Sequence, residues 1–262
     1  MSAILLESEV VHYEVLGRGR PVIFLHGWVG SWRYWIPVMQ AASLSFRAYA
    51  VDWWGFGDSA KRPERYSLDW QMALLDGFLD KMGMARAALV GHGLGGILAL
   101  MYARAHPEFI DRVMVVDLPF EEAMLSNRLR TSSPGDLADW LLAKTPQAEP
   151  VRLEVPKTDV RAVQASLSGL AGVGVADLLR SPAVNTLLVH GEKDPVVEPP
   201  RAEHLAGLPE QMHAVLFEGS GHFPMLDESS KFNRLMGDFT NLASGESPRS
   251  LSLKEEWKRR VR

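Results

Sequence analysis

Residues 91–95, with the sequence Gly-His-Gly-Leu-Gly, lie between an apolar strand pattern and an apolar helix pattern. A G-x-S-x-G run in this setting holds a nucleophilic serine on a sharp strand-to-helix turn. The central position here is Gly93, which carries no hydroxyl, thiol or carboxylate. A covalent acyl intermediate therefore cannot form at this position.

Two residues further along the chain have the types and order of a catalytic acid and base. His222 follows the last predicted strand in a glycine-rich loop, the kind of exposed position that a general base needs. Asp194 follows the preceding strand and is predicted to orient the imidazole. Asp117, at the end of an earlier strand, is an alternative acid, and we favour Asp194.

Short apolar strands alternate with longer helical patterns, which predicts strand–helix–strand units and a parallel sheet. The predicted strands cover 10–15, 22–25, 47–51, 87–90, 112–116, 186–190 and 213–217, and the predicted helices cover 32–42, 68–82, 96–105 and 230–242. The interval 118–182 is mostly helical and has no clear strand. An insertion at this point lies above the carboxyl ends of the strands, so we interpret it as a small helical cap. The alternative is a pair of ordinary surface helices.

The domain prediction follows from this pattern: a core formed by residues 1–117 and 183–243, a cap formed by 118–182, and a basic tail at 244–262. Within the tail, residues 249–262 contain six Lys or Arg side chains against two Glu. A helix would align Leu253, Trp257 and Val261 on one face. The tail is interpreted as a solvated segment, with docking to a partner or an acidic membrane surface as the alternative.

Composition excludes several classes of function. The 262 residues carry a net charge of −4, which predicts no general attraction to nucleic acid. The chain has no cysteine, so disulfides and thiol catalysis are absent. Neither a signal peptide nor an apolar run long enough for a membrane span is present. We therefore expect a soluble, cytoplasmic protein without a metal or organic cofactor.

The chain resembles the α/β-hydrolase superfamily, in its cap-bearing esterase, epoxide hydrolase and C–C hydrolase-like branch. The resemblance covers residues 10–242 and rests on five motifs in family order, at 24–28, 52–59, 91–96, 190–195 and 219–223. It implies a mostly parallel, twisted sheet with helices on both faces and a short cap inserted before the penultimate core strand.

The resemblance also assigns binding roles. Backbone N–H groups of Trp28 and Leu94 correspond to the family's oxyanion hole, and both survive a change at position 93. His26, Trp140 and Phe223 are expected to line a pocket for a small apolar molecule. His92 is expected to support packing.

Three functional hypotheses follow. In the first, the protein is an esterase-like hydrolase of a small apolar ester or related carbonyl substrate, and His222 activates a water in the space left by the missing side chain. In the second, it is a ligand-binding or sensor protein without catalysis. In the third, it is an inactivated form of an ordinary serine hydrolase. The retained acid and histidine favour the first hypothesis.

Overall fold

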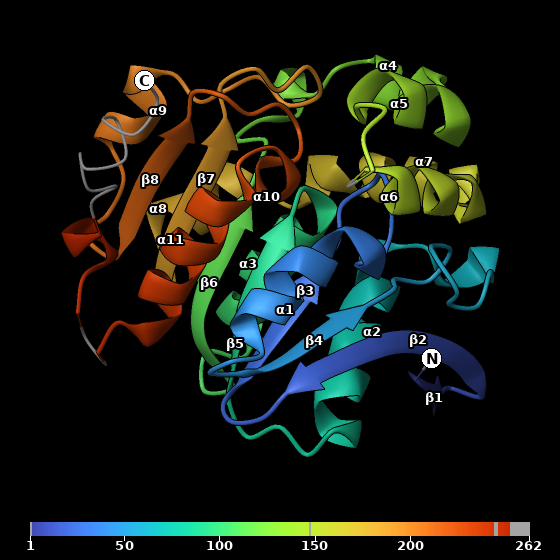
Figure 1. Ribbon diagram of the computed structural model, residues 1–262, viewed down its shortest axis with the longest axis horizontal. Helices are drawn as coiled ribbons and strands as arrows, with labels where there is room; N and C mark the ends of the chain where they lie inside the picture. Colours follow the sequence, from blue (N-terminus) through green and yellow to red (C-terminus); the bar gives the residue numbers. More distant parts are fainter. Residues whose placement is uncertain (1, 147, 244–245, 252–262) are drawn as a thin grey trace.

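The computed structural model describes residues 2–146, 148–243 and 246–251. Within these residues a single eight-stranded sheet runs in the order β1-β2-β4-β3-β5-β6-β7-β8 (Figure 1). The strands are β1 (Ser2–Leu6), β2 (Glu9–Gly17), β3 (Pro21–Leu25), β4 (Arg47–Val51), β5 (Ala87–His92), β6 (Ile110–Val116), β7 (Asn185–Gly191) and β8 (Met212–Phe217). The first three strands of this order pair antiparallel and the remaining pairs are parallel. The predicted α/β fold is confirmed.

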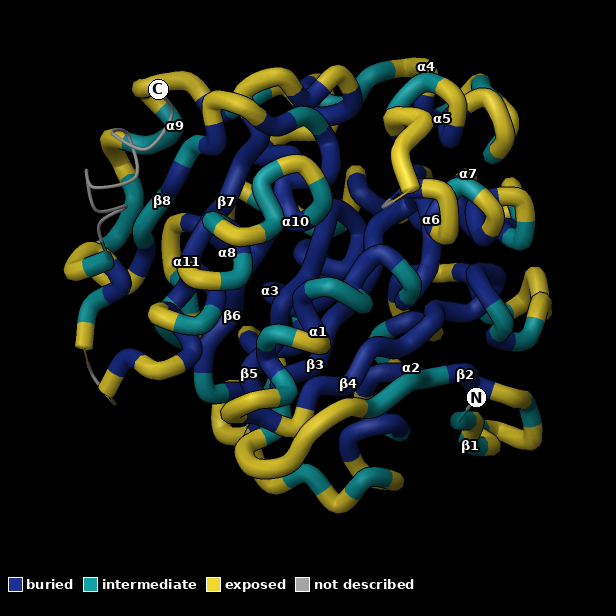
Figure 2. The backbone as a smooth tube through the Cα atoms, viewed as in Figure 1, coloured by how far each residue is buried: buried dark blue, intermediate teal, exposed yellow. Residues whose placement is uncertain are grey.

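Helices cover both faces of the sheet. One face carries α1 (Ile36–Ala42), α10 (Pro224–Asp227) and α11 (Ser229–Asn241), which contact one another. The other carries α2 (Leu68–Lys81), α3 (Leu94–Ala105) and α8 (Val175–Arg180), with α3 packed on β5 and β6. The central strands are buried along most of their length (Figure 2). Their near-continuous apolar sequences fit a sheet that is covered on both sides.

Two local features differ from the predicted elements. The predicted helix 32–42 is divided into a short 3₁₀ turn at Trp32–Trp35 and helix α1, because Pro37 occupies the first turn of α1 and begins it anew. Strand β1 was not predicted. It forms the antiparallel edge beside β2 and alternates between half-buried and exposed side chains.

Residues 118–182 separate β6 from β7. Their described part consists of α4 (Arg128–Thr131), α5 (Pro134–Leu141), α6 (Glu149–Glu154), α7 (Val160–Gly169), α8 and three short 3₁₀ turns, with only an isolated bridge from Leu125 to Val197 in strand geometry. Helices α4 to α7 gather beyond the carboxyl ends of β3 and β4 (Figure 1).

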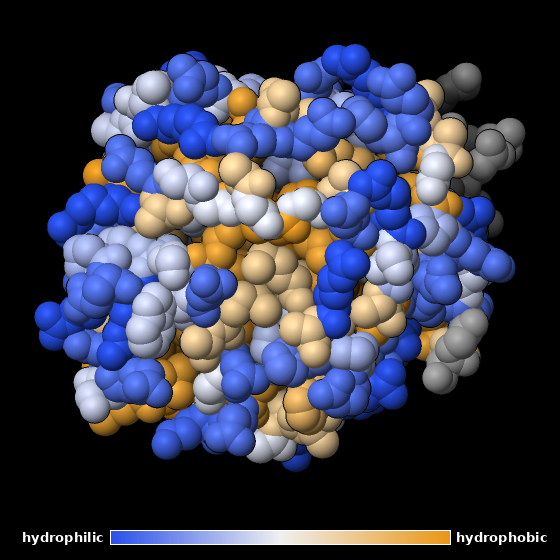
Figure 3. All heavy atoms as spheres, turned by 180° about the vertical axis from the view of Figure 1, so that it is seen from behind, coloured by the Kyte–Doolittle hydropathy of each residue, from blue (hydrophilic) through white to orange (hydrophobic). Residues whose placement is uncertain are grey.

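Helix α9 (Ala202–Ala206) lies between β7 and β8, and a 3₁₀ turn at Pro248–Ser250 ends the described chain. Most of the basic tail, including Leu253, Trp257 and Val261, lies outside the described residues. Seen from behind, hydrophilic side chains surround a central region where apolar side chains reach the surface (Figure 3). No helix in the described ranges is long and apolar enough to cross a membrane.

Candidate active site

The turn between β5 and α3 has the geometry of a nucleophile elbow without the nucleophile. Gly93 adopts φ 48° and ψ −110°, a positive-φ backbone conformation that residues other than glycine rarely adopt. Its N–H donates to Val116 O over 2.9 Å, and its carbonyl accepts from Ile97 N–H at the start of α3. Gly95 is required by close packing, since a Cβ there would lie 2.3 Å from Leu25 O. The tight strand-to-helix turn is therefore formed around a residue that has no side chain.

Asp194 and His222 form the predicted acid–histidine pair. They come from the loops after β7 and β8, and His222 Nδ1 lies 2.8 Å from Asp194 Oδ2. The other carboxylate oxygen of Asp194 accepts from the amides of Val196 and Val197, which fixes the carboxylate. His222 is only 2% exposed, so the exposed position expected from the sequence is wrong, and its Nε2 has no hydrogen-bond partner among the described residues. The imidazole is therefore oriented through Nδ1, and its Nε2 is the ring nitrogen not used in binding the described protein.

Electrostatics at this pair favour a basic histidine. Burial alone would lower the pKa of His222 by disfavouring the imidazolium. The charge and hydrogen bond of Asp194 outweigh that penalty and raise the pKa of His222 above 6.5. A neighbouring carboxylate thus makes the imidazole a better proton acceptor, which is what a general base requires.

The structure places Asp117, the alternative acid, in a different hydrogen-bond role. Its Oδ1 accepts from Gly191 N–H over 2.9 Å and lies 2.8 Å from His190 Nδ1. Its backbone has φ 49°, an unusual value for a residue with a side chain. Burial, followed by the charge of Asp194, raises the pKa of Asp117 well above its ordinary value. Asp117 binds the end of β7, while Asp194 is the residue that bonds to His222.

His92 and Tyr34 connect this pair to the loop after β3. The His92 and His222 rings pack with centroids 4.5 Å apart. His92 Nδ1 lies 3.0 Å from Tyr34 Oη, and the same hydroxyl accepts from Gly27 N–H over 2.6 Å. Burial, aided by the nearby histidines, lowers the pKa of His92 well below 6.5, so the ring is neutral at neutral pH. Tyr34 was not singled out from the sequence, because its partners are distant along the chain.

The Trp28 indole borders the position where a nucleophile side chain would begin. An ideal Cβ at residue 93 would lie 3.1 Å from Cε3 and from Cζ3 of Trp28. Trp28 Nε1 donates to Ser166 Oγ of α7 over 3.0 Å, and the indole is 1% exposed. The ring thus lies between the β5–α3 turn and helix α7. A serine at position 93 requires the indole to shift by a few tenths of an ångström.

The residues predicted to line the pocket occupy different environments. His26 is fully buried, with Nδ1 2.8 Å from Gly27 O and Nε2 accepting from Trp53 N–H, so both its ring nitrogens bind backbone. Phe223 packs against the His92 and His222 rings. Trp140 lies on α5, and Cζ of the Arg128 guanidinium lies over its indole, 4.0 Å from the ring centroid.

Side chains of metal-binding type gather at this site. His92, Asp117 and His222 each place one potential ligand atom within 4.8 Å of the others. One polar atom of each already faces Tyr34, His190 or Asp194 at hydrogen-bond distance. We interpret the group as an acid–histidine network.

Comparison with known proteins shows which family the chain belongs to. The family model described as "Alpha/beta hydrolase family" matches residues 22–235. The chain belongs to this family. The AB hydrolase superfamily protein YisY of Bacillus subtilis is 26% identical over 260 residues, which is 90% of this chain and 97% of that protein. The bifunctional epoxide hydrolase 2 of Sus scrofa is 36% identical over 115 residues, but the match spans only 20% of that enzyme's length and 42% of this chain.

Solved structures give the same fold. A variant of the meta-cleavage product hydrolase CumD from Pseudomonas fluorescens IP01, complexed with acetates, superposes with a TM-score of 0.78, covering 92% of this chain and 97% of that one at 24% identity. The enol-lactonase from Burkholderia xenovorans LB400 gives a TM-score of 0.79 at 19% identity, with 92% and 100% coverage. At these identities the likeness concerns the fold alone.

Proposed function

We propose that this α/β-hydrolase protein slowly hydrolyses a small apolar ester or related carbonyl substrate by direct attack of water. The observation that carries the proposal is the His222–Asp194 pair, joined over 2.8 Å, in which the opposite nitrogen of His222 is buried and has no hydrogen-bond partner within the described part of the chain. The lone pair on His222 Nε2 can accept a proton from a donor, and water is the smallest donor. The relatives named as hydrolases support the same reaction class.

In the proposed mechanism, His222 Nε2 takes a proton from water as the water oxygen attacks the carbonyl carbon. Asp194 stabilises the imidazolium that forms. The backbone N–H groups of Trp28 and Leu94 hold the developing oxyanion. Leu94 is the first residue of α3, so its amide is one of those that a helix leaves without an intrahelical acceptor. The imidazolium then returns its proton to the leaving oxygen.

The reaction should be slow because no covalent intermediate is available. Loss of the whole triad unit in a serine hydrolase costs about 10⁶-fold in turnover, and about 10³- to 10⁴-fold over water survives through the oxyanion hole and binding. We also propose that residues 118–182 act as the cap. The Trp28–Ser166 contact supports this role, because it joins α7 to the elbow.

The second candidate function is ligand binding without turnover. The Trp28 indole favours it, since the ring fills space next to Gly93 that a reacting group would use. A sensor of this kind would bind a small apolar molecule at the same site and release it unchanged. If the protein is an inactivated serine hydrolase, the parent should likewise bind ligand without turnover, but the Gly93→Ser variant should hydrolyse substrate efficiently.

The test compares hydrolysis of short-chain p-nitrophenyl esters by the parent protein, His222→Ala and Gly93→Ser. The proposal expects slow saturable turnover by the parent and none above buffer with His222→Ala. His213→Ala, on β8 and half-buried, is the matched control and should retain the parent rate. Equal rates for the parent and His222→Ala contradict the proposal.

Gly93→Ser separates the remaining hypotheses. If the oxyanion hole and the histidine are preorganised, the added hydroxyl should raise turnover by about 100-fold or more, since the missing nucleophile accounts for most of the deficit. The protein is a binding protein if the parent binds a ligand saturably without forming product and the Gly93→Ser variant turns over substrate no faster than the parent. Adding Trp28→Phe to the serine variant shows whether the indole limits the rescue.

A further inference from the structure

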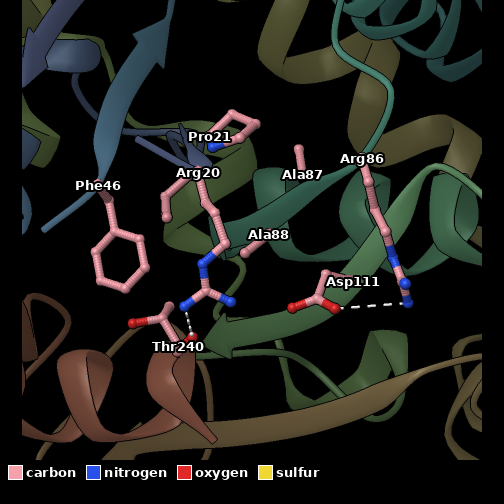
Figure 4. A pocket seen from close by; sticks show the side chains of 9 residues that line it. Arg20, Pro21, Phe46, Arg86, Ala87, Ala88, Asp111 and Thr240 are labelled. Atoms are coloured by element: carbon pink, nitrogen blue, oxygen red, sulfur yellow. Dashed lines mark hydrogen bonds and ion pairs between the residues drawn. The ribbon is translucent and has the colours of Figure 1, made fainter. Parts of the chain in front are cut away.

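The two edges of the sheet treat their polar groups differently. At the amino ends of β3 and β5, Arg86 and Asp111 on the wall of a cavity of about 290 Å³ form an ion pair over 3.5 Å (Figure 4). At the carboxyl ends, Trp28 N–H donates to no residue that the structure describes. Leu94 N–H begins α3 and therefore has no acceptor within that helix. These two N–H groups are the proposed oxyanion donors, and their placement decides whether they can act together.

The loop that holds Trp28 lies directly against the turn that holds Leu94. A Cβ at Gly27 would lie 3.0 Å from His92 Nδ1, and a Cβ at Gly93 would lie 3.8 Å from Gly27 Cα. Each proposed donor is one residue beyond one of these glycines. The separation between the two N–H groups is therefore set by how the loop and the turn are joined.

The Tyr34 hydroxyl joins the loop to the turn. Its oxygen accepts from Gly27 N–H over 2.6 Å and lies 3.0 Å from His92 Nδ1. Because the oxygen accepts from the amide, the hydroxyl hydrogen is left for His92 Nδ1, the one other atom at hydrogen-bond distance within the described residues. The Tyr34 ring is fully buried and packs against Trp35 and Phe223, so the hydroxyl is held at a fixed point.

The protonation state of His92 fits this direction of hydrogen bonding. Burial lowers the pKa of His92 well below 6.5, so the ring is neutral at neutral pH and one of its nitrogens can accept. If Nδ1 accepts from Tyr34, the ring proton lies on Nε2. That nitrogen faces Asp117 Oδ2 at 3.7 Å, and an acceptor oxygen on this side favours the same tautomer.

Both peptide groups of Gly27 are fixed by side chains. Tyr34 binds the Gly27 N–H, and His26 Nδ1 lies 2.8 Å from the Gly27 carbonyl oxygen. His26 Nε2 accepts from Trp53 N–H, so Nδ1 carries the ring proton and donates it to the carbonyl. In a planar trans peptide the next N–H points opposite to the carbonyl. The direction of Trp28 N–H is therefore determined by the contacts of Gly27.

We propose that Tyr34 is a positioning residue whose hydroxyl sets the separation and direction of the Trp28 and Leu94 N–H groups, so that both reach one oxyanion. Tyr34 acts through Gly27 and His92 and does not itself contact the substrate. The inference rests on the proposed function, because the oxyanion arises in the proposed hydrolysis.

Two probes separate the oxyanion donors from the rest of the site. The p-nitrophenyl methylphosphonate monoanion has a tetrahedral anionic centre like the intermediate of ester hydrolysis, and p-nitroacetanilide has a neutral planar carbonyl on the same ring. Isothermal titration calorimetry on the full chain should show tighter binding of the phosphonate to the parent. Tyr34→Phe should weaken phosphonate binding by about tenfold or more and change p-nitroacetanilide binding by less than about twofold.

Tyr102→Phe is the matched control. Tyr102 is also buried, and its hydroxyl donates to Asp76 over 2.8 Å. It lies near the other end of α3, about 12 Å along the helix from Leu94. This variant should keep the parent affinity for the phosphonate, and thermal unfolding should show that both tyrosine variants are folded.

Two variants of nearly equal shape test the role of His92. His92→Asn keeps an oxygen that can accept from Tyr34, and His92→Leu does not. Leucine should weaken phosphonate binding about as much as Tyr34→Phe, and asparagine should weaken it less.

The proposal is overturned if Tyr34→Phe binds the phosphonate as tightly as the parent, if Tyr102→Phe loses as much affinity, or if the two His92 variants bind equally. It is also overturned if the parent binds the phosphonate no more tightly than p-nitroacetanilide. Because these measurements do not require turnover, a protein that passes them without hydrolysing esters contradicts the proposed hydrolysis alone.

Discussion

Two buried acid–histidine pairs in this protein have similar geometry and different surroundings. His222 lies 2.8 Å from Asp194, and His12 on β2 lies 3.0 Å from Asp52 after β4. Asp52 also accepts from the amides of Trp32 and Asp58, and His12 Nε2 faces Glu14 at 3.4 Å. Neither Nε2 has a hydrogen-bond partner among the described residues, but His222 Nε2, unlike His12 Nε2, also has no described carboxylate at ion-pair distance.

The difference shows that a short acid–histidine contact does not identify a catalytic site. Asp52 holds three chain segments together, so its pair is part of the scaffold. Asp194 fixes one imidazole and leaves the far nitrogen of that ring available. Function should therefore follow the histidine nitrogen that faces no carboxylate. Stability should follow how far apart along the chain the segments lie that the acid joins, because Asp52 bonds to residues 12, 32 and 58, whereas the amides bound by Asp194 are two and three residues away from it.

The largest expected effect is on stability at Asp52. Asp52→Asn removes the charge opposite His12 and gives an amide to a group of donors, so it should lower the free energy of unfolding by about 3 kcal/mol or more. Urea unfolding measures this. Asp238→Asn breaks an exposed pair with Arg234 and should change stability by about 0.5 kcal/mol or less. Equal losses at both positions would contradict a scaffold role for Asp52.

The next effect is on turnover at Asp194. Asp194→Asn keeps an oxygen for the Val196 and Val197 amides but presents an amide N–H to His222 Nδ1, which reverses the tautomer of the ring. Ester hydrolysis should fall to the buffer rate, with a smaller loss of stability than at Asp52. Steady-state kinetics and urea unfolding of the same sample check both parts. A variant that keeps the parent rate removes Asp194 from the mechanism.

A smaller effect is expected where the helical segment meets the elbow. Ser166→Ala removes the acceptor of Trp28 Nε1–H and leaves that donor buried, at a cost of about 1–2 kcal/mol. Ser168→Ala, an exposed position on the same helix, is the control and should be nearly neutral. Chemical denaturation compares the two. If both variants match the parent, α7 does not hold the indole in place.

The smallest effect is the dependence of stability on pH. Burial opposes protonation of His12 and His222, but their acidic partners raise both pKa values above the unfolded value of 6.5. Their stabilising contribution is therefore complete below about pH 6.5 and declines as pH rises through the folded-state values. Unfolding measured at about pH 5.5 and pH 8 should show a smaller difference in His12→Gln than in the parent. A larger difference in the variant has the wrong sign.

The sequence predicted the parallel core because each central strand is a continuous apolar run beside a periodic helix. It predicted Asp194 and His222 because both follow strands in the order expected for the family. Tyr34 and His190 were missed, since their roles depend on hydrogen bonds to residues 58 and 73 positions away. The position of the Trp28 indole could not be predicted either, because it depends on a hydrogen bond to Ser166, 138 residues further along the chain.

The buried indole of Trp28 also gives the protein an internal optical reporter. Its one described hydrogen bond is to Ser166, and its six-membered ring faces the elbow glycine. A molecule that reaches Gly93 must displace the ring or stack on it, and either event alters the polarity around the indole. The difference in emission between the parent and Trp28→Phe isolates this residue from the other seven tryptophans. Ligand binding near Gly93 can thus be followed by the fluorescence of Trp28, whether or not the ligand is hydrolysed.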